Sequence, residues 1–212
     1  MAAGGIDDIL LPYNILGRIK LLRLVQLASK IRLSVTADSA DTVRGLSRAA
    51  VEAGLELEVM VEFDTGGGRC GVQTPSEAAE LAGIIENSPG LLFEGLMTYP
   101  VNENTDRFVQ ETRKFPGISF RKVSAGGTPQ LWQAHTFREI TEYRVGTYVF
   151  GDRYTVSAGT QTLDDCAFHV RSMVVSRPTA DRGILDAGSK ALSSDLLGQD
   201  GHGLILEYPR AR

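Results

Sequence analysis

The sequence predicts an α/β fold in which strands and helices alternate, followed by a β-rich segment. Short apolar runs of strand length recur through residues 1–152, and helical or helix-length segments separate them. This alternation favours a parallel sheet with crossover connections. After about Gly151 the rhythm changes to strand-like runs between turn clusters. Two architectures fit residues 1–152: a doubly wound sheet, or an incomplete (β/α)8 TIM-type barrel with about six of its eight strands.

The expected elements begin with a strand at residues 9–13, and several later elements carry a recognisable signal. Ser39 or Asp41 can cap a helix that Gly54 ends, and Thr74 followed by Pro75 is typical of a helix start. The clearest strand, residues 57–64, is rich in β-branched and large apolar side chains. Further strands are expected at residues 33–37, 91–99, 121–125 and 143–150, helices at residues 16–28, 39–53, 74–87 and 105–115, and strand-like runs at residues 169–176 and 184–185.

Composition and charge narrow the class of protein. Hydrophobic residues make up 42% of the 212 residues and charged residues 23%, which is enough apolar material for a sizeable core. The net charge of −4 argues against nucleic-acid binding, and the longest apolar runs are too short for a membrane span. The first residues lack the basic start of a secretory signal, and two cysteines do not suggest a disulfide framework. We therefore expect a cytoplasmic protein.

A glycine-rich loop with one arginine follows the strand at residues 57–64. Residues 62–71 read EFDTGGGRCG, so Arg69 stands near the carboxyl end of that strand. Parallel α/β folds bind ligands at that edge, glycines allow a ligand to approach closely, and arginine offers a fork of donors to an anion or a phenolate oxygen. The other interpretation is a flexible turn in which Arg69 pairs with Glu62 or Asp64. The residues alone favour neither.

Two further strand ends carry small residues suited to a phosphate. One is followed by Pro129, which could begin a helix whose dipole favours an anion. If the two strands are neighbours, their small residues form a two-sided phosphate grip. The other interpretation is an ordinary turn beside a buried strand with a β-bulge. The residues in question are Ser124, Gly126, Gly127, Thr128, Gly146 and Thr147.

The remaining chemical residues give weaker signals. Lys190 lies among small residues and could be read as a Schiff-base lysine, although pairing with Asp186 or Asp195 in a turn is favoured. Tyr99 ends a strand and is either a packing aromatic or a residue that faces a cofactor ring. The histidines stand apart from one another, so no metal site is expected. The cysteines are expected to be small buried hydrophobes. These histidines and cysteines are His135, His169, His202, Cys70 and Cys166.

Taken together, several segments resemble the D-threonine aldolase and D-serine dehydratase family, whose fold is similar to that of alanine racemase. The resemblance covers nearly the whole chain in the family's order. It implies a partial pyridoxal-phosphate barrel over residues 1–152 and a partial β domain over residues 153–212. The segments are AAGGIDDILLPY, RLSVTADS, VEFDTGGGRCGV, FEGLMTY, VSAGGTP, YRVGTYVFGD and VVSRPTADRGILDAGSKALSSD.

The resemblance also implies a cofactor and roles for particular residues. Pyridoxal 5′-phosphate is the implied cofactor, with Arg69 facing its ring oxygen and Tyr99 lying against its pyridine ring. The implied partners are a small-molecule D-amino acid substrate and, in a possible homodimer, a second copy of the chain. The residues implied to hold the cofactor phosphate are Ser124, Gly126, Gly127, Thr128, Gly146 and Thr147.

The chain departs from the family's pattern at three places. It begins at what resembles the third barrel strand, so the Schiff-base lysine at the end of the first strand has no counterpart. Lys20, Lys30 and Lys190 do not replace it. The family's divalent-metal ligands lie near its C-terminus and are expected to be missing here as well. After Tyr99 the family usually has glycine and histidine, whereas here Pro100 follows, so the substrate side differs.

Three functions follow as expectations. The first is a pyridoxal-phosphate-dependent lyase that cleaves D-3-hydroxy amino acids to glycine and an aldehyde, impaired in this chain because the lysine is absent. The second is a D-serine dehydratase-like ammonia-lyase, and the third is a non-catalytic pyridoxal-phosphate-binding protein. A barrel without its first two strands would also leave an open sheet edge, so we expect poor solubility or pairing with another chain.

Overall fold

The computed structural model describes residues 1–208 and divides into two compact units. The first unit contains Met1–Gly127 and Gln133–Arg144, and the second contains Thr128–Trp132 and the chain from Val145 onward. The last four residues of the expected β domain, 209–212, lie outside the described residues. Among residues 1–208, no helix combines the length and the apolar character needed to cross a bilayer.

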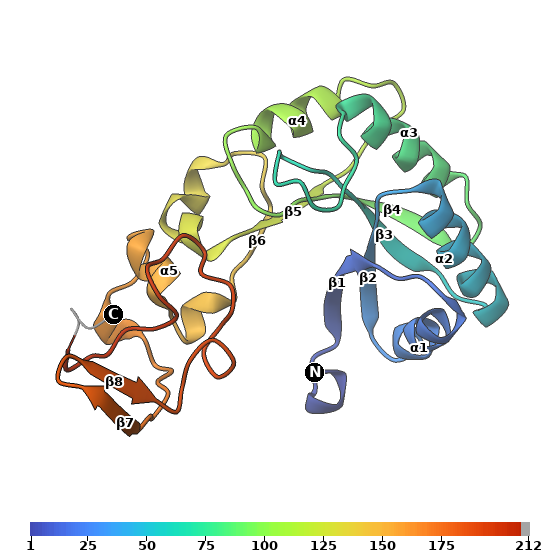
Figure 1. Cartoon of the computed structure of the whole chain (residues 1–212). Coiled ribbons are helices and arrows are strands. Elements are labelled where there is room, and N and C mark those ends of the chain that lie inside the picture. Colours follow the sequence, from blue (N-terminus) through green and yellow to red (C-terminus); the bar gives the residue numbers. More distant parts are fainter. Residues whose placement is uncertain (209–212) are drawn as a thin grey trace. The chain divides into compact units, whose positions relative to one another are not determined.

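The first unit is built on a parallel sheet that forms a half-barrel (Figure 1). Within residues 1–208, the six strands of this sheet lie in the order β1-β2-β3-β4-β5-β6. A doubly wound sheet reverses its strand order at a switch point, whereas a barrel adds each strand beside the previous one. The sequential order therefore confirms the incomplete TIM-type barrel. The strands are β1 (Asp8–Asn14), β2 (Arg32–Ala37), β3 (Leu57–Glu62), β4 (Leu91–Met97), β5 (Lys122–Gly126) and β6 (Glu142–Arg144).

Helices connect the first five strands in turn, and two of these helices begin at the capping residues that the sequence indicates. Ser39 caps α2 by accepting a hydrogen bond from the Thr42 amide, and Gly54 ends the helix with φ 65°. Thr74 and Glu77 form a capping box at the start of α3. These caps satisfy amides that have no partner within the helix, so they fix where each crossover begins. The helices of this unit are α1 (Arg18–Ala28), α2 (Ala40–Ala53), α3 (Pro75–Glu86) and α4 (Thr105–Thr112).

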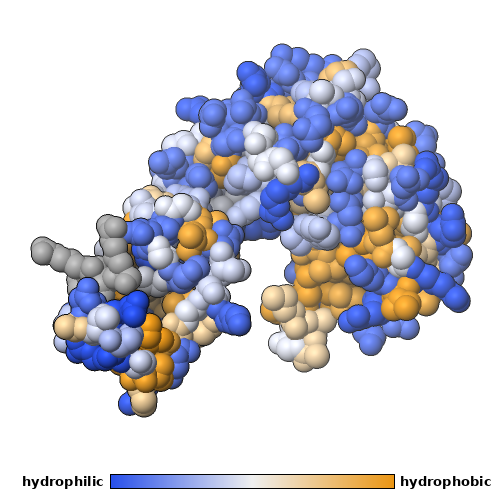
Figure 2. Space-filling view, viewed as in Figure 1, coloured by the Kyte–Doolittle hydropathy of each residue, from blue (hydrophilic) through white to orange (hydrophobic). Residues whose placement is uncertain are grey.

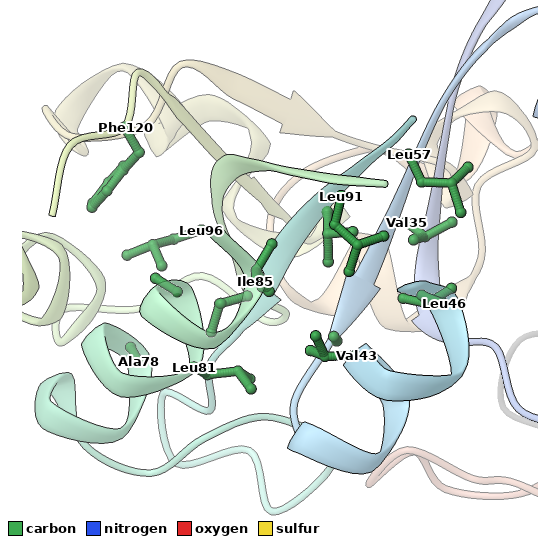
Figure 3. Packing of buried hydrophobic residues seen from close by; sticks show 14 of the residues in the cluster. Val35, Val43, Leu46, Leu57, Ala78, Leu81, Ile85, Leu91, Leu96 and Phe120 are labelled. Carbon is green, nitrogen blue, oxygen red and sulfur yellow. The ribbon is translucent and has the colours of Figure 1, made fainter. Parts of the chain in front are cut away.

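The hydrophobic core lies between these helices and one face of the sheet (Figure 3). In β2, Leu33, Val35 and Ala37 belong to the core, and residues 57, 59 and 61 do the same in β3. Successive side chains of a strand point to opposite faces. The intervening residues of these strands, which lie on the other face, are Ser34, Thr36, Glu58, Met60 and Glu62. The helix-covered face is therefore apolar, whereas the opposite face carries acidic and hydroxyl groups.

The strand expected at residues 143–150 is much shorter than the sequence suggests. Strand β6 covers only Glu142–Arg144, and a 3-10 helix η3 follows at Thr147–Val149. Strand β5 pairs with β6 as far as Gly126 opposite Arg144, and β5 ends there. The β-branched and aromatic residues after Arg144 have high strand propensity but no neighbouring strand with which to pair. The prediction of a longer strand was therefore wrong.

The second unit contains short helices and a hairpin, as the change of rhythm indicates. Strands β7 (Val174–Thr179) and β8 (Arg182–Leu185) pair antiparallel. Helix α5 (Arg153–Ser157) was not expected, although Asp152 caps it by accepting from the Thr155 amide. Both hairpin strands are exposed along their whole length, and Figure 2 shows hydrophobic surface there. The other 3-10 helices within residues 1–208 are η1 (Ala2–Gly4), η2 (Thr128–Thr136) and η4 (Leu163–Asp165).

Candidate functional site

The glycine-rich loop after β3 is held by Asp64. One carboxylate oxygen of Asp64 accepts hydrogen bonds from the Gly66 and Gly67 amides at 3.0 and 2.7 Å, and the other accepts from Gly68 at 3.0 Å. Gly71 has φ 116°, and a Cβ there would lie 2.6 Å from the Asp64 nitrogen, so this position requires glycine. The loop is therefore an organised turn. Asp64 binds its amides, which argues against the interpretation in which Asp64 pairs with Arg69.

Arg69 and Tyr99 come together although they follow different strands. The Arg69 guanidinium carbon lies 5.0 Å from the centre of the Tyr99 ring, which is a cation–π contact. Arg69 is exposed and Tyr99 is 45% exposed, so both can reach a ligand at the carboxyl ends of β3 and β4. The two residues that the sequence singles out separately therefore form one cationic and aromatic surface.

Arg144 is a central polar residue of this edge, although its sequence context predicted no role for it. Its guanidinium donates to the Ser124 hydroxyl at 2.6 Å and to the Thr98 carbonyl at 2.9 Å. A contact at 3.2 Å joins it to the Met97 sulfur. Burial holds the pKa of Arg144 below its ordinary value. A lone arginine at the carboxyl end of a strand was a usable signal, because Arg69 was singled out for the same reason.

The small residues at the end of β5 pack closely against the neighbouring strand β6 and form hydrogen bonds with it. A Cβ on Gly126 would lie 2.6 Å from the Arg144 carbonyl oxygen, so this glycine permits close strand pairing. Gly127 has φ 141°, and its amide donates to the same oxygen at 3.2 Å. Its carbonyl accepts from the Tyr143 hydroxyl at 2.7 Å. Ser124 and both glycines are buried in the first unit.

The other residues predicted to hold a phosphate belong to the second unit. Thr128 begins η2 and is 5% exposed, whereas Gly146 and Thr147 are exposed at the start of η3. No hydrogen bond joins Thr128 to Gly146 or Thr147 within residues 1–208. Their phosphate role therefore stays a sequence-based prediction.

A second polar cluster, which sequence reasoning missed, consists of Asp38, Glu62 and Cys70. One ligand atom from each side chain lies within 4.8 Å of the others. Burial and the neighbouring Asp38 carboxylate raise the pKa of Glu62 to about 7, although Arg69 and Arg144 oppose this. Burial also raises the pKa of the Cys70 thiol, with Glu62 and Asp38 adding to the effect. Asp38 and Glu62 belong to different strands, so their convergence with Cys70 depends on strand register and on the path of the glycine loop.

The described lysines of the first unit lie away from the carboxyl ends of its strands. In the described first unit, Lys20 lies on α1, Lys30 and Lys114 follow helices, and Lys122 begins β5 at its amino-terminal end. Lys190 is exposed in a loop of the second unit, and the ion pair expected with Asp186 or Asp195 does not form among the described residues. His202 contacts the Ser193 carbonyl, and His135 and His169 are exposed.

Similarity to known proteins agrees with this fold. The chain is 32% identical to the D-threonine aldolase of Arthrobacter sp, over 91% of this chain and 56% of that protein. It is 28% identical to the 3-hydroxy-D-aspartate aldolase of Paracoccus denitrificans, over 92% of this chain and 57% of that protein. The chain thus spans about half the length of the curated relatives it matches.

Solved structures show the same likeness. The crystal structure of D-threonine aldolase from Filomicrobium marinum matches with a TM-score of 0.76 and 26% identity, covering 96% of this chain and 59% of that one. An alanine racemase-like protein from Idiomarina loihiensis matches with a TM-score of 0.77 and 26% identity, covering 95% and 58%.

Family membership follows from the segments matched. Residues 167–211 match the family described as putative serine dehydratase domain. Residues 9–154, more than half of the chain, match the family described as alanine racemase, N-terminal domain. The expected resemblance to the D-threonine aldolase and D-serine dehydratase family is thereby confirmed. The chain belongs to the alanine racemase N-terminal domain family.

Proposed function

We propose that this chain binds pyridoxal 5′-phosphate and forms part of a lyase that acts on D-3-hydroxy amino acids. The observation that carries the proposal is the Arg69–Tyr99 pair, because it sets a cation and an aromatic ring at the carboxyl ends of β3 and β4. This edge is where enzymes of the barrel fold bind their ligands. The D-threonine aldolase and hydroxyaspartate aldolase relatives support the reaction class.

The residues of the first unit suit this cofactor. The exposed Arg69 guanidinium offers donors to a phenolate oxygen or an anion, and the half-exposed Tyr99 ring offers an apolar surface to a heteroaromatic ring. The fully buried Ser124 hydroxyl accepts a hydrogen bond from Arg144 through its oxygen, so that bond does not use the Ser124 proton. We assign binding of the cofactor ring to Arg69 and Tyr99, and phosphate binding to the strand end at Ser124.

The reaction that we propose is cleavage of the Cα–Cβ bond, which releases glycine and an aldehyde. When bound, pyridoxal phosphate supplies an electron sink for the charge that develops at Cα. Arg69 would hold the negative charge of the bound molecule, and the Asp64-bound loop would keep that arginine in place.

A dehydratase is the second candidate, and one specific similarity favours it. The D-threo-3-hydroxyaspartate dehydratase of Delftia sp. is 28% identical over 91% of this chain. A dehydratase removes the β-hydroxyl and releases ammonia, whereas an aldolase releases an aldehyde. The product formed from D-threonine therefore separates the two functions.

The mode of cofactor binding that we propose is noncovalent. No described lysine of the first unit stands at the carboxyl end of a strand, where Arg69 and Tyr99 lie. A Schiff base needs an amine within covalent reach of the cofactor. We therefore propose that turnover by this chain alone is slow.

Cofactor binding is tested by titrating the purified chain with pyridoxal phosphate in a calorimeter. We expect saturable binding that Arg69→Ala and Tyr99→Leu each weaken at least tenfold, because each removes one contact to the ring. Arg121→Ala is the matched control, since Arg121 is an exposed arginine at the other end of β5. Equal weakening by all three variants would overturn the assignment. Borohydride fixation of one equivalent onto a single lysine would overturn the noncovalent mode.

The reaction class is tested by incubating the cofactor-saturated chain with D-threonine and measuring aldehyde and ammonia. Slow aldehyde release supports the aldolase, whereas ammonia release without aldehyde overturns it in favour of the dehydratase. Saturable cofactor binding with neither product would contradict both enzymes and leave a noncatalytic binding protein.

A further inference from the structure

Three side chains from separate segments converge beside the loop after β3. The last register pair of β2 and β3 joins Ala37 to Val61, so the next residues, Asp38 and Glu62, leave adjacent strands at the same level. Cys70 lies in the organised glycine loop, and the Gly71 amide donates to Asp38 at 3.2 Å. The three ligand atoms lie within 4.8 Å of one another. The convergence therefore follows from strand register and from a braced loop.

Glu62 is buried and forms no ion pair with any of the described residues. It is 7% exposed, and its Oε2 atom has no hydrogen-bond partner within residues 1–208. Buried carboxylates are normally paired, hydrogen-bonded or bound to a metal. Arg69 contacts the Tyr99 ring, and Arg144 donates to Ser124 and Thr98, so neither forms an ion pair with Glu62 in the described chain. A cation bound at Glu62 would supply the partner that the described residues do not.

We infer that Asp38, Glu62 and Cys70 form a binding site for a divalent transition metal, with zinc as the best fit. Two carboxylates and one thiolate match the ligand preferences of zinc, whereas calcium and magnesium take oxygen ligands only. Donor atoms around a tetrahedral zinc lie roughly 3.3 to 3.8 Å apart. Side-chain rotations that move the three ligand atoms by on the order of 1 Å would bring them to that spacing.

The surrounding charge and the ligand number agree with this assignment. Three deprotonated ligands carry three negative charges, a divalent ion cancels two, and the field of Arg69 and Arg144 acts on Glu62 to offset the remainder. Three protein ligands leave a fourth tetrahedral position for water or a substrate oxygen. The site does not depend on the cofactor, because none of its three ligands is assigned to the pyridoxal phosphate.

The site is tested by titrating the chelator-treated full chain with cobalt(II) as the only added metal, and then with zinc(II). We expect one equivalent of cobalt to give a thiolate-to-cobalt charge-transfer band that zinc abolishes. Cys70→Ser should remove the band, while Cys166→Ser, the matched control in the second unit, should keep it. Glu62→Gln and Asp38→Asn should each weaken binding at least tenfold, since removing a ligand costs at least as much as removing a group that merely orients one. Glu52→Gln, on the exposed surface of α2, should leave binding unchanged.

A second measurement needs no variant and so does not depend on how a variant folds. Zinc should slow alkylation of Cys70 in the wild-type chain, measured by peptide mass spectrometry, and leave the rate at Cys166 unchanged. Equal alkylation of Cys70 with and without zinc would overturn the site. So would a charge-transfer band that survives Cys70→Ser, or cobalt affinity that is the same in the wild type and in Glu62→Gln.

Discussion

The two ends of the sheet in the first unit differ in whether their glutamate side chains form ion pairs. At the amino-terminal ends, Arg32 contacts Glu58 at 3.0 Å and Glu94 at 3.1 Å, and Lys122 forms ion pairs with Glu94 and Glu142. At the carboxyl ends, Glu62 is buried and forms no ion pair with any residue in positions 1–208. The charged groups at the amino-terminal ends therefore hold neighbouring strands together, whereas Glu62 at the carboxyl ends has no ion-pair partner among the described residues.

The pKa values at the two ends move in opposite directions. Burial would raise the pKa of Glu58, but hydrogen bonds from Arg32 and Ser34 hold it below the ordinary value. Burial and Asp38 raise the pKa of Glu62 to about 7. A lowered carboxyl pKa stabilises the fold above the ordinary pKa, and this stability is lost in acid. A raised one destabilises the fold as the pH rises through the interval between the two pKa values.

The largest expected effect is that of Glu62→Gln at the carboxyl end. The folded protein binds more protons than the unfolded chain between the ordinary pKa of 4.5 and about 7, so the free energy of unfolding falls over that interval. In metal-free buffer at pH 8 the variant should therefore be more stable by about 3 kcal/mol. Urea unfolding of both proteins from pH 4 to 8 checks this. A constant difference between them across the whole range would contradict the account.

Glu94→Gln should give the next largest effect, with the opposite sign. One Glu94 oxygen contacts both Arg32 and Lys122, and its side chain is only 10% exposed. The variant leaves two cations with a neutral partner and should lower the free energy of unfolding by about 2 kcal/mol at pH 7. Chemical denaturation measures the loss. If Glu94→Gln were as stable as the wild type, these ion pairs would not stabilise the fold. The proposed difference between the two ends of the sheet would then be wrong.

Glu58→Gln should have a smaller effect that disappears in acid. The Glu58 side chain is 24% exposed and pairs with Arg32, so we expect a loss of about 1 kcal/mol at pH 7. Because the pKa of Glu58 is lowered, its contribution is lost as the pH falls below the ordinary value of 4.5. Thermal unfolding at pH 7 and pH 3 should show the two proteins converging in acid. Divergence in acid would reverse the sign that we assign.

Asp8→Asn is expected to have the smallest effect. Its 3.4 Å contact with Arg32 joins side chains that are 58% and 52% exposed, so solvent screens the pair. The loss should stay below about 0.5 kcal/mol. The same denaturation experiment measures it, and a loss as large as that of Glu94→Gln would show that burial does not set the strength of these pairs.

The sequence predicts most of the strand and helix order but not the polar face of the sheet. The apolar run at residues 57–64 indicates β3, and Thr74 with Pro75 indicates α3. Periodicity alone left the barrel and the doubly wound sheet equally open, because strand order is a long-range property. The strand expected beyond Arg144 was also wrong because of a long-range property. The residues there have high strand propensity but no neighbouring strand with which to pair.

The sequence predicted only those residues of the candidate site that can be recognised one at a time from their local context. Arg69 and Tyr99 stand after recognisable strands, although nothing in their spacing says that they touch. Glu62 reads as one more residue of a hydrophobic strand. Its meeting with Asp38 and Cys70 depends on the register between β2 and β3 and on the path of the glycine loop.

The most direct measurement is a 13C NMR titration of the glutamate side-chain carboxyls in the metal-free chain. One resonance should titrate with a midpoint near pH 7, and it should be missing from the spectrum of Glu62→Gln. Such a resonance would show that the carboxyl end of the sheet holds a buried carboxyl group whose charge no ion pair stabilises. Titration of every glutamate near its ordinary value of 4.5 would contradict this.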